Sequence, residues 1–296
     1  MKIRILMILF AILLQVSIAY CQSNLNEFPV LKGKYFGQIP PGDTAKIFAK
    51  DLISEKGRFE FGVSFSPNGK ELLVGTQERD TASVIYTKKT KNGWAKPKKT
   101  SLSNGKFTNE MEPFFTPDGK QIYFAPFNQW DRIRLWSVDI SSQGWVNQRI
   151  LDTVVAAFPA FYPVCSSNKT LYYSNIDDRK IYKSKFQNGR YAKPELVGLP
   201  FGFHCFIAPD ESFALIDGDL NGLGESDICV VFKNKADQWG KPINLGKRVN
   251  SEYSETCPAL SHDGKYIFFS RYNEVNELSD IYWVSAKIIE ELRLKQ

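Results

Sequence analysis

The chain has 296 residues, of which 43% are hydrophobic, 14% aromatic and 24% charged, and its formal net charge is +6. This composition excludes collagen-like, coiled-coil and disordered proteins. Nothing in the sequence resembles a nucleic-acid-binding motif, and so small a net charge predicts no strongly charged partner.

Residues 1–21 have the pattern of a secretory signal peptide. Lys2 and Arg4 precede an apolar run from Ile5 to Leu14, and small residues follow near a cleavage site after Cys21. No later segment contains the roughly 20 apolar residues that a membrane-spanning helix needs. We therefore expect a mature protein without a transmembrane segment, located in the periplasm or secreted.

The end of this segment has a second interpretation. Residues Ile18–Cys21 resemble a bacterial lipoprotein signal, although the bulky Tyr20 departs from that pattern. We therefore favour cleavage after Cys21 over a lipid anchor at Cys21.

Four cysteines remain after removal of the signal peptide. Their spacing is not that of a zinc site, and export permits disulfides without requiring any. They are Cys165, Cys205, Cys229 and Cys257.

The main organising feature is a repeat of about fifty residues. Five segments align on one turn residue each, and the steps between successive turns are 50, 50, 42 and 53 residues. The turn residues are Ser66, Thr116, Ser166, Ala208 and Ser261. A nearly fixed period of this length is typical of stacked structural units.

Each unit has the pattern of four antiparallel strands. An apolar run leads into a turn of the Pro-Asn/Asp-Gly type, as at residues 117–119, and a second strand such as Ile122–Phe124 follows. A third strand and, after a turn with Gly and an aromatic residue, a fourth strand complete most units. Four strands per repeat predict the blade of a β-propeller.

The two ends of the chain complement each other. The fifth unit has no fourth strand after Ala286, and residues 44–52 take the place of a fourth strand before the first unit. We predict an all-β fold, a single propeller of five four-stranded blades whose ring is closed by this N-terminal strand and leaves few exposed sheet edges. The expected division is a signal peptide at 1–21, a lead-in segment at 22–39, the propeller at 40–287 and a C-terminal tail at 288–296.

These residues resemble a known family. The pattern Pro-x-Phe-Ser-Pro-Asp-Gly-Lys, best seen at Pro113–Lys120 and Ser261–Lys265, is similar to the WD40-like PD40 repeats of TolB-type β-propellers. The resemblance covers roughly residues 40–286. It implies a propeller fold, with six blades, the usual number in that family, as the alternative to five.

Equivalent positions of the repeat should form rings of side chains around the centre, because the first strands of all units run the same way. Six residues before the turn residue, three units have a glutamate: Glu60, Glu110 and Glu255. Two residues later, on the same face of the strand, the five units have Gly62, Glu112, Tyr162, His204 and Cys257.

Two interpretations of these rings are open. Clustered carboxylates are costly unless they bind a cation, share protons or accept hydrogen bonds. The functional hypothesis is therefore a ligand-binding pocket at the channel mouth, formed by Glu60, Glu110, Glu112, Tyr162, His204 and Glu255. The structural hypothesis, which we favour, is that the glutamates accept backbone N–H groups from adjacent blades.

A second candidate site is a loop that begins like a calcium loop. Residues 217–222 match the pattern D-x-D-x-N-G, in which alternating oxygens surround a hard cation. The acid expected at the twelfth position is replaced by Ile228, so we favour a Gly-rich loop without metal and expect no other cofactor. The candidate Ca²⁺ ligands are Asp217, Asp219, Asn221 and Asp227.

The leading functional hypothesis is an exported, non-enzymatic propeller that serves as a scaffold for binding a protein or glycan of the cell envelope. The alternative is a glycoside hydrolase, since that reaction needs two carboxyl groups, which the central channel could supply. Against it, Glu60, Glu110 and Glu255 are equivalent positions of a repeat, which is more typical of architecture than of a separate acid and base.

Overall fold

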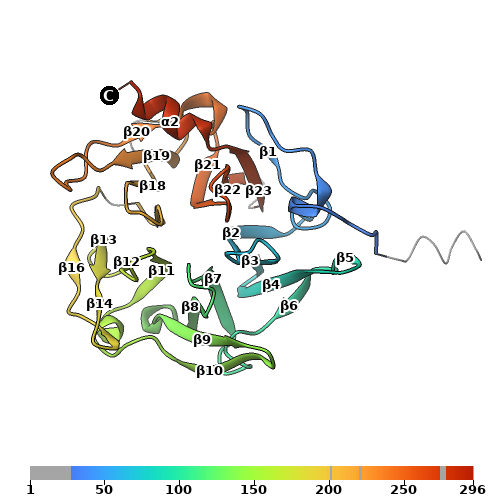
Figure 1. Cartoon of the computed structure of the whole chain (residues 1–296), viewed down its shortest axis with the longest axis horizontal. Helices are drawn as coiled ribbons and strands as arrows, with labels where there is room; N and C mark the ends of the chain where they lie inside the picture. Colours follow the sequence, from blue (N-terminus) through green and yellow to red (C-terminus); the bar gives the residue numbers. More distant parts are fainter. Residues whose placement is uncertain (1–27, 201, 220–221, 274–277, 296) are drawn as a thin grey trace, which may run out of the picture.

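The computed structural model describes residues 28–200, 202–219, 222–273 and 278–295, and it is mostly β (Figure 1). The predicted signal peptide, including Cys21, lies outside the described residues. No helix in the described part of the chain has the length and apolar character that a membrane span requires.

Antiparallel groups of four strands, which resemble propeller blades, make up most of the fold. One sheet contains β2 (Phe59–Phe65), β3 (Glu71–Glu78), β4 (Thr81–Thr90) and β6 (Lys98–Thr100), and β5 (Gly93–Trp94) also pairs with β4. The next contains β7 (Asn109–Phe115), β8 (Gln121–Phe127), β9 (Trp136–Ser141) and β10 (Gly144–Ile150). Another contains β11 (Ala160–Cys165), β12 (Leu171–Asn175), β13 (Lys180–Ser184) and β16 (Glu195–Leu196), beside the small pair β14 (Phe186–Gln187) and β15 (Arg190–Tyr191).

The remaining strands follow the same plan. One sheet contains β17 (Cys205–Ile207), β18 (Phe213–Gly218), β19 (Asp227–Phe232) and β20 (Ile243–Asn244). The last group contains β21 (Ser254–Leu260), β22 (Tyr266–Asn273), β23 (Leu278–Ser285) and β1 (Lys46–Ile47). A short parallel pairing, Phe59 in β2 with Ser279 in β23, joins this group to the first in one nine-stranded sheet. Short helical turns lie between them: η1 (Tyr35–Gly37), η2 (Trp130–Arg132), η3 (Val155–Ala157) and η4 (Gly246–Arg248).

The sheets are arranged around a common centre (Figure 1). Their first strands form a closed series of neighbours, because β2 contacts β7, β7 contacts β11, β11 contacts β17, β17 contacts β21, and β21 contacts β2. At the outer side of the last sheet, β1 pairs antiparallel with β23, and Lys46 lies opposite Trp283. A strand from the N-terminal part of the chain thus completes the sheet formed by its C-terminal part.

The turn after each first strand explains the sequence repeat. In one turn, the hydroxyl of Ser66 donates to the side-chain oxygen of Asn68 at 2.9 Å, and Gly69 has a φ of 64°. Equivalent hydroxyl bonds join Thr116 to Asp118, Ser166 to Asn168, and Ser261 to Asp263. Where the repeat lacks glycine, Lys169 and Glu211 adopt φ values of 66° and 61°, so the degenerate units keep the same backbone turn.

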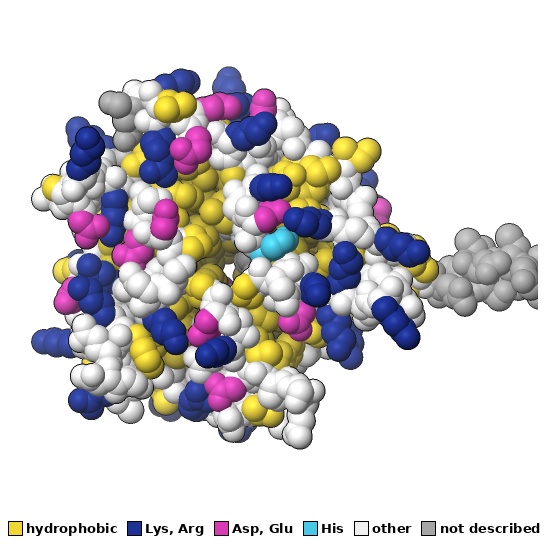
Figure 2. Space-filling model, viewed as in Figure 1, with side chains coloured by type: hydrophobic (Ala, Val, Ile, Leu, Met, Phe, Trp, Pro, Cys, Tyr) yellow, Lys and Arg dark blue, Asp and Glu magenta, His cyan; other side chains and the backbone are white. Residues whose placement is uncertain are grey.

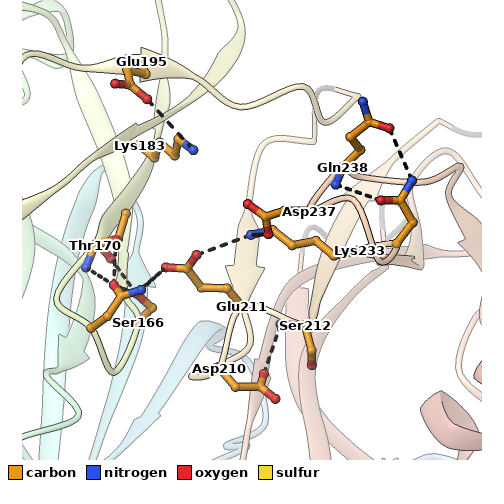
Figure 3. Close-up of polar contacts among 12 residues, drawn as sticks. Ser166, Thr170, Lys183, Glu195, Asp210, Glu211, Ser212, Lys233, Asp237 and Gln238 are labelled. Carbon is orange, nitrogen blue, oxygen red and sulfur yellow. Dashed lines mark hydrogen bonds and ion pairs between the residues drawn. The ribbon is translucent and has the colours of Figure 1, made fainter.

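One of these residues also links two sheets. Glu211 accepts hydrogen bonds from Ser166 Oγ at 2.8 Å and Asn168 Nδ2 at 3.0 Å, both in the equivalent turn of the preceding sheet (Figure 3). The Nζ of Lys233 lies 3.4 Å from Glu211 Oε2 and 2.8 Å from Asp237 Oδ1. Lys233 therefore forms ion pairs with both acids. The residue that replaces glycine therefore adds polar contacts that a glycine could not make.

The lead-in segment packs across the junction of the first and last sheets. Tyr35 is 4% exposed, and its ring centroid lies 5.5 Å from that of Phe65 in β2 and 5.4 Å from that of Trp283 in β23. Its hydroxyl donates to Asp263 Oδ1 at 2.7 Å. Part of the segment predicted only as a lead-in thus contributes to the hydrophobic core.

A second ring fixes the segment to the outer hairpin of the first sheet. The centroid of Phe36 lies 4.7 Å from that of Trp94, and the indole N–H of Trp94 donates to the carbonyl of Gly33 at 3.0 Å. The backbone N–H of Trp94 donates to the carbonyl of Leu31 at 2.9 Å. We call residues 31–37 the clasp, because they contact both sheets.

The segment predicted as a C-terminal tail is largely helical. Helix α2 (Lys287–Arg293) buries Ile288 and Ile289 in the main hydrophobic core. Glu291 on this helix accepts a hydrogen bond from Arg248 Nη2 at 2.5 Å. The apolar pair Ile288–Ile289 is the sequence feature that explains why this end packs on the sheets.

The clasp should contribute strongly to stability. We expect Tyr35→Ala to lower the free energy of unfolding by about 3–5 kcal/mol, because it removes a buried aromatic ring. Tyr35→Phe keeps the ring and should cost about 1 kcal/mol for the lost hydrogen bond. Chemical denaturation measures both changes, with Phe158→Ala, at a half-exposed ring, as the control. Equal stability of Tyr35→Ala and wild type would contradict the packing role of the clasp.

Candidate functional site

A bulge in the first strands creates a layer of side chains at the centre. Gly62, Glu112, Tyr162 and Cys257 all have φ between 52° and 60°, and the strand pairing shifts by one residue around each of them. A bulge of this kind re-aims the side chain of the extra residue. Three of the four positions hold a residue other than glycine, for which this conformation is costly.

Glu112, Asp217 and His204 form the polar group of this layer. The imidazole Nδ1 of His204 contacts Asp217 Oδ2, and the backbone N–H of His204 donates to Asp217 Oδ1 at 2.8 Å. On the other side of the ring, Nε2 lies 3.3 Å from Glu112 Oε1. Both carboxylates are buried, so the imidazole lies between two acids that are shielded from water.

Tyr162 joins this group to the opposite side of the centre. Its backbone N–H donates to Glu112 Oε2 at 2.5 Å, and its hydroxyl donates to the carbonyl of Pro258 at 2.7 Å. The ring centroid lies 4.8 Å from that of His204, in an edge-to-face arrangement. Tyr162 therefore positions the carboxylate of Glu112 and one edge of the imidazole together.

The surroundings of His204 favour its charged form. Burial by itself lowers the pKa of an imidazole, but the charge and hydrogen-bond contributions of Asp217 and Cys257 together hold the pKa of His204 well above its ordinary value. Burial also raises the pKa of the Cys257 thiol, against the opposite influence of His204. The surroundings thus favour the protonated form of both the imidazole and the thiol.

The three equivalent glutamates do something different. Glu110 accepts hydrogen bonds from the N–H groups of Leu102 and Ser103 at 2.7 and 3.0 Å. These donors belong to the loop that leads from β6 of the preceding sheet into β7. The carboxylate therefore holds the entry loop of its strand, as the structural hypothesis expects.

Glu255 and Glu60 repeat this arrangement and each add an arginine. Glu255 accepts the N–H of Ser251 at 3.0 Å and lies 2.7 Å from Arg271 Nε. Glu60 accepts the N–H of Glu55 at 3.2 Å and lies 2.7 Å from Arg58 Nε. Burial raises the pKa of Glu60 to about 8, although Arg58 opposes this shift.

The six residues predicted for one pocket therefore fall into two groups. Glu112, Tyr162 and His204 meet at the centre, whereas Glu60, Glu110 and Glu255 bind the loops that enter their strands. The expectation that both rings share one strand face was wrong, because the bulge breaks the two-residue alternation between them.

A cavity of about 310 Å³ extends from the central layer toward the turns that end the first strands. Glu112, Tyr162 and Gly62 lie at the end that we call the floor, and Ser167, Pro209 and His262 lie at the turn end, or mouth. Its wall is largely apolar and includes Val63, Phe65, Pro113, Phe115, Val164 and Phe206. Figure 2 shows hydrophobic side chains around a central hollow on one face of the molecule, with basic side chains farther out.

The candidate calcium ligands are not brought together as a group. Asp217 pairs with Ile228 and Asp227 with Gly218 in the β18–β19 ladder, so the two acids point to opposite faces. Asp217 contacts His204, whereas Asp227 accepts the N–H of Leu223 at 2.7 Å. Asp219 is exposed, and Asn221 lies outside the described residues. Within the described ranges, no cluster of three or more His, Cys, Asp or Glu side chains has a metal-binding arrangement.

Asp217 is the central residue whose role the sequence analysis missed. The loop pattern predicts it only as a calcium ligand, although the hairpin register contains the signal for its contact with His204. Cys205 pairs with Ile216, so the next positions outward, His204 and Asp217, lie opposite each other. A cross-strand reading of the hairpin therefore predicts the contact.

Known proteins resemble this chain in structure but not in sequence. No protein-family model matches the chain, and no curated protein matches it. A structure provisionally assigned as TolB, from Agrobacterium tumefaciens, is 17% identical with a TM-score of 0.51, over 75% of this chain and 73% of that one. A GH62 hydrolase in complex with xylotriose is 11% identical with a TM-score of 0.53, over 82% of this chain and 97% of that one.

TolB from Acinetobacter baumannii is also similar, at 13% identity and a TM-score of 0.47, over 76% of this chain but only 54% of that protein. The fold is that of a β-propeller. At such identities the likeness extends to the fold and not to an activity.

The loop-binding role of Glu110 can be tested by removing its charge. We expect Glu110→Gln to destabilise the protein by about 1–3 kcal/mol, because the new amide group would oppose the N–H donors of Leu102 or Ser103. Glu78→Gln, at an exposed position of β3, is the matched control. Denaturation curves compare the two variants, and unchanged stability of Glu110→Gln would contradict the structural hypothesis.

Stability should also depend on the charge of His204. Because its folded-state pKa is raised, its contribution is fully present below about pH 6.5 and is lost as the pH rises through the folded-state pKa. We therefore expect wild type to lose more stability than His204→Gln between pH 6 and 8.5. Glu60 titrates in both proteins, so the difference between their pH slopes isolates His204. Parallel slopes in the two proteins would refute the assignment.

Proposed function

We propose that this chain is an exported, non-enzymatic β-propeller that binds a protein of the cell envelope through its central cavity. In this proposal the fold is a single ring of five four-stranded blades, closed by β1 (Lys46–Ile47), which lies within the predicted segment 44–52. The pairing of β1 with β23 and the closed series of first strands support the ring. Residues 1–21, which lie outside the described part of the chain, support export by their sequence.

The observation that carries the proposal is the apolar wall of the central cavity. A cavity of about 310 Å³ is at the lower end of the size range of ligand sites, which begins near 300 Å³. It can therefore hold one large side chain or a small ligand rather than a folded domain. Side chains that fill such desolvated cavities commonly dominate the affinity of protein interfaces.

The same wall favours a protein over a glycan. Each sugar hydroxyl that enters the cavity loses hydrogen bonds to water, and an apolar wall offers few replacements. An aliphatic or aromatic side chain loses nothing comparable and gains from removal of its surface from water.

The alternative, a glycoside hydrolase, has less support. That reaction needs an acid and a second carboxylate that both reach the substrate. The carboxylates of Glu60, Glu110 and Glu255 bind entry loops, and those of Glu60 and Glu255 also pair with arginines. The carboxylate of Asp217 binds His204 and a backbone N–H. The likeness to a GH62 hydrolase is one of fold.

The test is selection of peptides from a random displayed library on the immobilised protein. We expect enrichment of peptides with apolar side chains and their loss of binding to Ser167→Trp, in which an indole at the mouth would obstruct the cavity. Ser142→Trp, in the exposed turn between β9 and β10, is the matched control and should bind as wild type does. Calorimetry on selected peptides measures the dissociation constants.

Two results would count against the proposal. Selected peptides that bind both tryptophan variants equally would place the binding surface elsewhere. Release of sugar from oligosaccharides by wild type, and its loss in a carboxylate variant, would favour the hydrolase.

A further inference from the structure

Basic residues are concentrated in one part of the chain. Residues 81–109 contain seven lysines and no acidic residue, so this segment alone exceeds the net charge of the whole chain, +6. Six of these lysines lie on β4, β5, β6 and the turns between them, and five of the six are exposed. We call the six the lysine surface: Lys88, Lys89, Lys91, Lys96, Lys98 and Lys99.

The lysine surface is not neutralised by other parts of the chain. Within the ranges that the structure describes, none of the six lysines forms an ion pair. Exposed lysines elsewhere do, since Lys169 pairs with Asp118 and Lys34 with Asp263. Like charges held close together repel one another, so an anionic partner would be attracted to this surface.

Protection of a sheet edge accounts for only part of the lysine surface. Lysines on an edge strand discourage pairing with another chain, and Lys98 and Lys99 in β6 fit that role. Lys88 and Lys89 lie in β4, where Lys88 is opposite Glu71 of β3 and Lys89 is opposite Trp94 of β5. Because β4 is paired on both sides there, these two lysines protect no edge.

The clasp brings the aliphatic side chain of Val30 to the lysine surface. The carbonyl of Leu31 accepts the backbone N–H of Trp94 at 2.9 Å, so the residues before the clasp lie against β5. A methyl group of Val30 lies close to Gly93, and Val30 is nevertheless 69% exposed. An exposed aliphatic group thus adjoins the hairpin that contains Lys91.

A second exposed aliphatic residue, Ile39, follows the clasp and is 88% exposed. Its neighbour Gln38 lines a cavity together with Lys96 and Pro97, which places Ile39 close to the lysine surface. Aliphatic groups gain nothing from contact with a soluble polyanion, but they gain when they enter the headgroup boundary of a bilayer. Lysines beside exposed aliphatic residues therefore match a membrane surface.

We propose that the lysine surface binds the anionic headgroups of a lipid bilayer, with Val30 and Ile39 entering the headgroup region. Each lysine near an anionic bilayer contributes about fivefold to the affinity. The inference adds a contact outside the central cavity and does not depend on what the cavity binds.

The position of the lysine surface is compatible with simultaneous use of the cavity. Figure 2 shows Lys and Arg side chains close together at the right of the view, where Figure 1 places β4, β5 and β6. The hollow lies at the centre of the same face. A bilayer that meets the side of the molecule therefore leaves the mouth of the cavity free for a partner protein.

The experiment is sedimentation of the mature protein, residues 22–296, with lipid vesicles. Vesicles of phosphatidylcholine are compared with vesicles of equal parts phosphatidylcholine and phosphatidylglycerol, which are anionic. We expect at least about tenfold tighter binding to the anionic vesicles. The difference should disappear at about 1 M salt, where the screening length falls to about 3 Å.

Neutral substitutions test the position of the charges. The variant Lys91→Gln/Lys98→Gln/Lys99→Gln should bind the anionic vesicles about a hundredfold more weakly than wild type. The matched control loses the same charge at exposed lysines of other sheets and should bind as wild type does. Its substitutions are Lys193→Gln, Lys235→Gln and Lys241→Gln.

The aliphatic residues test whether the partner is a membrane. Val30→Ser/Ile39→Ser should weaken binding to the anionic vesicles about tenfold, because less apolar surface leaves water. It should leave binding to polyphosphate, a soluble polyanion, unchanged. The matched control, Leu196→Ser/Leu294→Ser, removes two exposed aliphatic side chains elsewhere and should not affect either partner.

Three results would overturn this inference. One is equal vesicle binding by the two triple lysine variants. Another is unchanged vesicle binding by Val30→Ser/Ile39→Ser together with equally tight binding of polyphosphate, which would favour a soluble polyanion. The third is failure of wild type to bind vesicles, with self-association of the Lys91→Gln/Lys98→Gln/Lys99→Gln variant, which would make the lysines protectors of a sheet edge. The peptide selection tests the cavity separately, so either proposal can fail without the other.

Discussion

The centre of the molecule depends on one backbone constraint, the left-handed bulge in the first strands. Without it, residues two apart on a strand would face the same way, and the glutamates at 60, 110 and 255 would share a surface with Glu112 and Tyr162. The bulge separates them. It directs one set of side chains toward the axis and leaves the other set to bind the loops that enter the strands.

The cost of this conformation indicates what it supports. A left-handed residue other than glycine costs on the order of 1 kcal/mol or more, and it persists only where surrounding contacts fix it. At Tyr162, those contacts include the N–H bond to Glu112 and the hydroxyl bond to Pro258. The strained backbone of Tyr162 thus holds the carboxylate of Glu112, which in turn contacts the imidazole of His204. Buried charges are tolerated there because each has a partner.

The arrangement of strands can be predicted from the sequence more completely than the contacts at the centre of the propeller. Turn chemistry is local, so the Pro-Asn/Asp-Gly pattern predicts the hairpins. The alignment of the repeats on their turns predicts that Glu112, Tyr162 and His204 lie at one height. The bulge escapes prediction because only Gly62 carries a visible preference for positive φ; Glu112, Tyr162 and Cys257 do not. The clasp could not be predicted for another reason. Tyr35 and Phe36 lie outside the repeat, and their contacts depend on the assembled sheets.

The pairing of β1 with β23 has a consequence for the order of folding. The two strands lie more than 200 residues apart in sequence, so the last sheet cannot be completed until nearly the whole chain is available. Contacts of such separation slow folding, because the loop between them must close first. In the export that we propose, the N-terminal strand would leave the membrane first and stay unpaired the longest. Its short length, two paired residues, limits the exposed strand edge on which unwanted association could begin.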